Sequence, residues 1–112
     1  MTDPHHLIRK EYDQALGLML AGKLEESAQA MEALLQKNPE FLDGHEGLAM
    51  VYSRLGRLDD AIRLMEILEK KDPNNIMVHT NLSVFYMKKG DKERAEMEKA
   101  KATVLKFSKG SK

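Results

Sequence analysis

A chain of 112 residues is long enough for one domain with a continuous core and too short for two. Its 18 Lys and Arg balance its 18 Asp and Glu, so no net charge favours nucleic acid or an anionic membrane. The absence of Cys excludes disulfides and thiolate chemistry, and no run approaches the ~18 apolar residues that span a bilayer. Because the first residues also lack the pattern of a secretory signal, we expect a cytoplasmic protein.

Three glycines and two prolines reveal an internal repeat. Gly22, Gly56 and Gly90 lie 34 residues apart, and Pro39 and Pro73 each follow a glycine by 17 residues. Several agreements in one register are not a coincidence, so the chain is predicted to contain three copies of one unit. The units in this register are residues 8–41, 42–75 and 76–109.

Each unit has the pattern of two helices joined by a glycine turn, which is clearest in the second unit. Gly56 ends the first helix, because glycine accepts the left-handed conformation of a helix end. Helical spacing resumes from Leu58 to Leu68 and stops at Asp72–Asn75, since Pro73 disfavours helical geometry in the residue before it. Each unit is therefore predicted to be two antiparallel helices of about 14 residues. The apolar face of the first helix consists of Leu48, Ala49, Tyr52 and Leu55.

The last helix departs from this pattern. Polar side chains at Lys92, Glu96 and Lys99 stand where apolar residues would pack on a further repeat, so we expect a solvated cap. Its apolar residues continue through Phe107, which predicts a longer helix and then a frayed tail over residues 108–112.

Charge is concentrated in this last segment. From Lys88 to Lys112 nine basic residues face four acidic ones, so the segment carries about +5 and the rest about −5. Contact with an acidic partner is the alternative to a solvated cap. Nucleic acid is not expected, because no aromatic residue interleaves with these charges before Phe107.

On these residues the chain resembles the tetratricopeptide repeat family, a 34-residue helix–turn–helix with a glycine turn, a terminal proline and small residues where helices cross. The resemblance covers residues 8–107, nearly the whole chain. It implies an all-α fold: three tetratricopeptide repeats, or six antiparallel helices, in a short right-handed superhelix that forms one domain over residues 1–112. The small residues at the crossings are Ala15, Ala49 and Ser83 in the first helices and Ser27, Ala61 and Ala95 in the second helices.

The family resemblance also implies a function, namely a non-enzymatic scaffold that binds another polypeptide in a concave groove formed by the first helices. Methionine and other apolar residues on a face that solvent would keep polar favour an apolar or amphipathic segment as the partner. The groove residues carried over from the family are Tyr12, Leu16, Met19, Leu20, Met50, Arg54, Met77, Asn81, Val84 and Met87.

Two other roles for the groove stay open. It can be closed by packing within the chain, or it can mediate self-association, groove to groove or head to tail through the opposite charges. One subset of the family clamps the C-terminal carboxylate of chaperones. That role is disfavoured, because four of the five clamp positions lack the required charge or amide. Those positions are Tyr12, Leu16, Gly47, Met77 and Asn81.

Histidines are the remaining candidates for chemistry. His45 and His79 occupy equivalent repeat positions, and we expect each to pack near a helix start rather than serve an enzyme or metal carrier. Three rigid ligands for a catalytic zinc cannot be assembled from the sequence. No glycine-rich phosphate loop or Ser/His/Asp pattern is present. No catalytic residue, cofactor, metal, nucleic acid or membrane insertion is expected.

Overall fold

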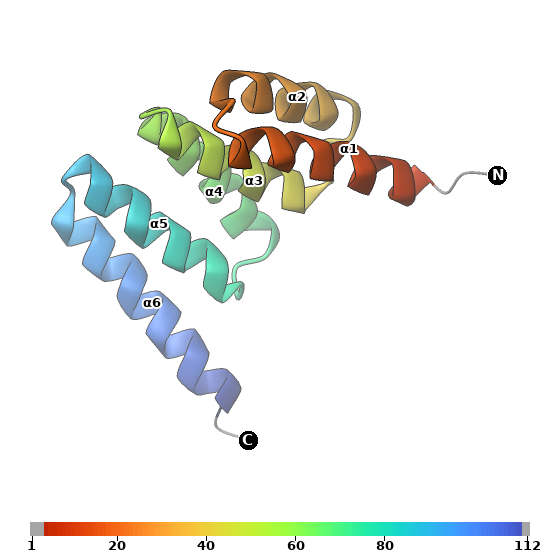
Figure 1. The fold of residues 1–112 in the computed structure, drawn as a ribbon. Helices are drawn as coiled ribbons and strands as arrows, with labels where there is room; N and C mark the ends of the chain where they lie inside the picture. Colours follow the sequence, from red (N-terminus) through yellow and green to blue (C-terminus); the bar gives the residue numbers. More distant parts are fainter. Residues whose placement is uncertain (1–3, 111–112) are drawn as a thin grey trace. The chain divides into compact units, whose positions relative to one another are not determined.

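The computed structural model describes residues 4–110, with side chains as far as Ser108, and these residues form six α-helices and no strand (Figure 1). The expected all-α class with three helix–turn–helix repeats is confirmed. The predicted longer last helix is also confirmed. The predicted tail is wrong for residues 108–110, which still belong to that helix, and Ser111 and Lys112 lie outside the described residues. The helices are α1 (Pro4–Leu20), α2 (Leu24–Lys37), α3 (Leu42–Arg54), α4 (Leu58–Lys71), α5 (Ile76–Lys89) and α6 (Lys92–Gly110).

The helices fall into two compact units, Met1–Arg57 and Leu58–Lys112. In the first unit, α2 packs against both α1 and α3, and in the second unit α5 packs against both α4 and α6. Each unit therefore has its own three-helix core. That the three repeats make up one domain stays a prediction.

The repeat glycines end the first helix of each hairpin. Gly22, Gly56 and Gly90 have φ values of 82°, 82° and 91°, a region that side chains with a Cβ rarely occupy. In each case the N–H of the next residue donates to a carbonyl five residues earlier, for example from Asp91 to Tyr86 at 2.9 Å. This is the Schellman arrangement, which satisfies carbonyl groups left over at a helix end.

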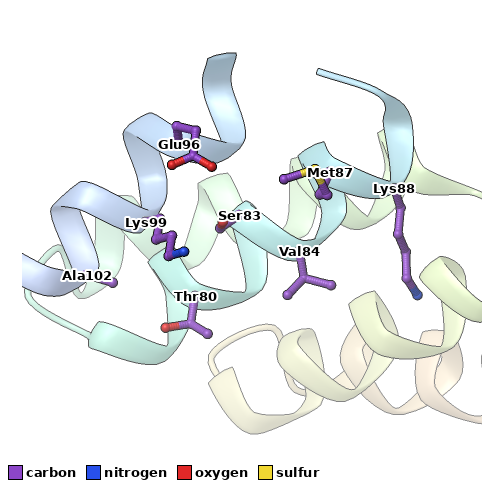
Figure 2. A pocket seen from close by; sticks show the side chains of 8 residues that line it. All are labelled: Thr80, Ser83, Val84, Met87, Lys88, Glu96, Lys99 and Ala102. Atoms are coloured by element: carbon purple, nitrogen blue, oxygen red, sulfur yellow. The ribbon is translucent and has the colours of Figure 1, made fainter. Parts of the chain in front are cut away.

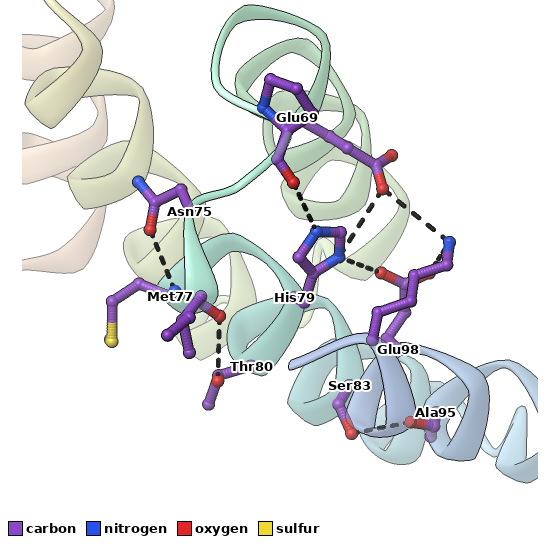
Figure 3. A network of polar contacts seen from close by, with 11 residues as sticks. Glu69, Asn75, Met77, His79, Thr80, Ser83, Ala95 and Glu98 are labelled. Carbon is purple, nitrogen blue, oxygen red and sulfur yellow. Dashed lines mark hydrogen bonds and ion pairs between the residues drawn. The ribbon is translucent and has the colours of Figure 1, made fainter. Parts of the chain in front are cut away.

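Small residues lie where the two helices of a hairpin cross, as the repeat predicts. In the first unit the Ser27 hydroxyl of α2 donates to the Ala15 carbonyl of α1 at 2.7 Å. In the second unit the Ser83 hydroxyl of α5 donates to the Ala95 carbonyl of α6 at 2.8 Å (Figure 3). The backbones approach closely enough for these bonds because no bulky side chain separates them.

Candidate functional site

Tyr12, a predicted groove residue, is instead a packing element of the first unit. Its side chain is only 9% exposed, and its ring meets that of Phe41 edge-on with centroids 5.3 Å apart. It also lies against Gly47 of α3, where an added Cβ would come within 2.7 Å of the ring. Above the ring, the Arg9 guanidinium pairs with Asp43 at 2.7 Å. The expectation that Tyr12 faces an open groove is wrong, because α3 packs over it.

Met19 is also buried, with 5% of its surface exposed, so the same expectation is wrong for this residue. It belongs to the face of α1 that takes part in the core of the first unit. The other predicted groove residues of this unit keep some access to solvent: Leu16 is half-buried, whereas Leu20, Met50 and Arg54 are exposed.

In the second unit the predicted groove residues are more accessible. Met77, Val84 and Met87 of α5 are 52%, 46% and 48% exposed. Asn81 is half-buried, and its amide lies 3.9 Å from the Met65 sulfur. Exposed apolar side chains that recur on one helix are typical of an interaction surface.

A cavity of about 480 Å³ lies between α5 and α6, and we call it the α5–α6 cavity (Figure 2). Val84, Met87 and Ala102 form apolar walls of the cavity. Lys88 and Lys99 also line it, and each has an aliphatic side chain that ends in a positively charged ammonium group. The other residues that line it are Thr80, Ser83 and Glu96.

A buried polar cluster holds α5 to its neighbours (Figure 3). The Nδ1 atom of His79 lies 2.9 Å from a Glu98 carboxylate oxygen and 3.6 Å from one of Glu69, and Nε2 lies 3.1 Å from the Pro73 carbonyl. The Lys101 ammonium binds the other Glu98 oxygen at 3.0 Å. Both ring nitrogens face oxygens that can only accept, so the imidazole is doubly protonated when Glu98 is ionised.

The pKa of His79 reflects two opposing effects. Burial alone would lower it, but the hydrogen bonds to Glu98 and to the Pro73 carbonyl, with the charges of Glu98 and Glu69, raise it above its ordinary value. The bond to Glu98 likewise raises the pKa of Lys101. The two carboxylates therefore favour the protonated forms of both His79 and Lys101.

Glu69, His79 and Glu98 also correct one statement of the sequence analysis. Their ligand atoms lie within 4.8 Å of one another, so three possible metal ligands do come together. The Lys101 ammonium and the His79 imidazolium already balance the two carboxylates, and a cation would have to displace both positive charges. The absence of a metal stays a prediction. His45, with Nδ1 3.1 Å from the Phe41 carbonyl, is buried near a helix start as expected.

A signal for this cluster was present in the sequence. The position of Glu98 in the last repeat is occupied by Ala30 in the first repeat and by Leu64 in the second. The position of Glu69 in the second repeat is occupied by Leu35 in the first. A carboxylate at an apolar position of a repeat requires a partner if it is buried.

None of the helices formed by residues 4–110 combines the length and the apolar content needed to cross a bilayer.

Comparison with known proteins agrees with the repeat pattern. A family model described as Tetratricopeptide repeat matches residues 18–80, more than half of the chain. No curated protein matches the chain.

Several solved structures share the fold. A crystal structure of MamA matches with a TM-score of 0.85 and 20% identity over 94% of this chain and 61% of that one. A MamA mutant matches with a TM-score of 0.78 and 23% identity over 88% and 72% of the two chains. The type III secretion translocator chaperone SycD of Yersinia enterocolitica matches with a TM-score of 0.83 and 20% identity over 88% and 73%. The chain spans about 60% of the length of several MamA chains.

Proposed function

Because the chain belongs to the tetratricopeptide repeat family, whose members are non-enzymatic protein-interaction modules, we propose that it is a scaffold that binds an apolar or amphipathic segment of another polypeptide. The observation that carries this proposal is the exposed row of Met77, Val84 and Met87 on α5. Full burial of an exposed side chain of this kind gives roughly 1.5–3 kcal/mol, and these side chains, already half-buried, would contribute about half of that each.

Two further observations support the proposal. Met50 of α3 is 37% exposed, so each unit presents methionine to solvent on the first helix of a repeat. The flexible thioether adapts to apolar partners of different shapes. A similar fold also serves in SycD, a translocator chaperone.

Self-association is the alternative function, either through the same methionine-rich surface or head to tail through opposite charges. The charge distribution favours the head-to-tail form. The segment that begins at Lys88 contains nine basic and four acidic residues, so it would attract the acidic remainder of another copy.

The double variant Met50→Glu with Met87→Glu tests the proposal. We expect it to lose capture of the native partner in a pull-down while circular dichroism shows unchanged helix content, because both side chains are exposed. The matched control is Ile67→Glu with Met97→Glu, two apolar residues of similar exposure on α4 and α6, which should keep the partner.

Two results would contradict the proposal. If the double variant unfolds, the two methionines belong to the core. If it stays folded and still captures the partner, binding lies elsewhere, and the basic surface around Lys92 and Lys99 becomes the first place to test.

A further inference from the structure

The α5–α6 cavity lies at the repeat position that another helix occupies in the first unit. Each of the eight residues that line the cavity has an equivalent position two repeats earlier in the sequence, and all eight equivalent positions lie on α1 and α2. Six of those eight counterparts are buried in the core: Tyr12, Ala15, Met19, Ala28, Met31 and Leu34. In that unit α3 packs against α2 and α1, and its Gly47 lies against Tyr12.

The second unit leaves the equivalent surface open. Met87 is 48% exposed, whereas its counterpart Met19 is 5% exposed. Within residues 4–110, α6 continues as one helix from Lys92 to Gly110 (Figure 1). The cavity therefore resembles a surface for a helix that the described residues of this unit do not supply.

We propose that the α5–α6 cavity binds an acidic amphipathic α-helix of a partner polypeptide, which packs there as α3 packs on the α1–α2 hairpin. This inference rests on the proposed scaffold function and specifies both the place and the form of the bound segment.

The size of the cavity defines one property of that helix. In the first unit the Tyr12 ring fills the space in front of Gly47, so α3 needs no side chain at that position. In the second unit the counterpart of Tyr12 is Thr80, which leaves space within a cavity of about 480 Å³. The partner helix is therefore expected to carry a large apolar side chain where α3 has Gly47.

Charge defines the second property. Lys99 replaces the buried Met31 of the first unit, and it makes no ion pair with any residue in the described range 4–108. Lys88 lies at the same cavity, and Glu96 is the one acidic residue among its eight lining residues. A carboxylate on the partner helix would pair with Lys99 in a partly desolvated site, where such a pair is stronger than on an open surface.

A second copy of this chain fits the site less well. In a head-to-tail stack α1 of the second copy would take the place of α3, and it would present Lys10 and Asp13 where α3 has Gly44 and Gly47. Both residues are exposed in the first unit and would have to be buried as charges. The occupant is therefore a helix with a different, more apolar face.

Synthetic peptides of residues 41–55 test this inference with the full chain, because they carry the helix that fits the equivalent surface. One peptide keeps Gly47 and the other has Gly47→Phe, and both retain Asp43 and Glu46 as acidic residues. A hydrocarbon staple between positions 50 and 54, both exposed in α3, is needed because short peptides are marginally helical in water. Fluorescence anisotropy of the labelled peptides measures the affinity.

We expect the Gly47→Phe peptide to bind the wild-type chain about tenfold more tightly than the Gly47 peptide. Thr80→Tyr should reverse this preference, because it restores the tyrosine that packs against glycine in the first unit. Lys99→Glu should weaken binding of the Gly47→Phe peptide by about tenfold. The control Lys92→Glu makes the same charge change on α6 outside the cavity and should leave the affinity unchanged.

Three results would overturn the inference: no binding beyond that of a scrambled stapled peptide, binding that neither Thr80→Tyr nor Lys99→Glu alters, or a dimer of the chain that Lys99→Glu dissolves. The failure of this inference can be distinguished from the failure of the scaffold function. If Met50→Glu with Met87→Glu abolishes native partner capture while Thr80→Tyr and Lys99→Glu do not affect it, the scaffold function stands. The helix in the cavity is then excluded.

Discussion

At the scale of single residues, the pair of His79 and Glu98 has the most definite chemistry in the structure. Both side chains are at least nine-tenths buried, and their 2.9 Å contact joins α5 to α6. Glu69 adds an ion pair from α4, so three helices meet at one imidazole. Removing one member of such a buried charged set leaves the others uncompensated, which costs more than an average hydrogen bond.

This cluster makes the stability of the second unit depend on pH. The pKa of His79 is raised in the fold above the 6.5 of an ordinary histidine. The stabilisation by the imidazolium is therefore complete below pH 6.5 and is lost as the pH rises through the folded-state pKa. His79→Gln should cost about 1.5–3 kcal/mol at pH 6 and less at pH 9, measured by urea unfolding.

His45→Gln is the matched control for this measurement. His45 is also buried near the start of a first helix, but its Nδ1 faces the Phe41 carbonyl rather than a carboxylate. Its substitution measures the cost of removing a buried imidazole that faces a carbonyl group. A cost of His79→Gln that is the same at pH 6 and at pH 9 would contradict the assignment of the imidazolium.

At the scale of helices, most of the architecture is present in the sequence. The turn at Gly90 and the break at Pro73 follow from backbone stereochemistry, which acts locally, so the predicted helix boundaries agree with the structure. The apolar period identifies which face of each helix is buried, and the repeat then places the buried Ala95 where α6 crosses α5.

The candidate binding surface is less predictable from the sequence, for a physical reason. Tyr12 and Met19 were carried over as groove residues, yet α3 covers them, and repeat alignment alone does not show how far one helix overlaps another. The pairing of His79 with Glu98 depends on side chains 19 residues apart on two helices, which only their packing brings together.

The complete burial of Ala61 should make Ala61→Leu destabilising. Ala61 of α4 has no exposed surface, so the added side chain would force its neighbours apart and cost on the order of 1–3 kcal/mol. Ala100→Leu makes the same change at an exposed position of α6, and as the control it should alter stability little. Thermal unfolding followed by circular dichroism makes the comparison. Equal melting temperatures for wild type and Ala61→Leu would count against the assigned repeat register.

At the scale of the whole molecule, the charge distribution is the property most relevant to assembly. Equal numbers of acidic and basic residues give no net charge, but the segment from Lys88 onwards carries about +5. Some of this charge is used internally, since Lys89 pairs with Asp59 at 2.5 Å and Lys101 pairs with Glu98. The net positive charge of the segment would attract an acidic partner or the acidic part of another copy of the chain.

Sedimentation at several protein concentrations and two salt concentrations distinguishes these possibilities, and we expect a monomer throughout. The reason is that α1 would bury Lys10 and Asp13 if a second copy stacked on the α5–α6 cavity. A head-to-tail complex held by opposite charges would instead appear at low salt and dissociate as salt rises, because screening shortens to about 8 Å at physiological ionic strength. A dimer that persists at high salt would bury Met77, Val84 and Met87 between copies, and it would replace the scaffold with a self-assembling module.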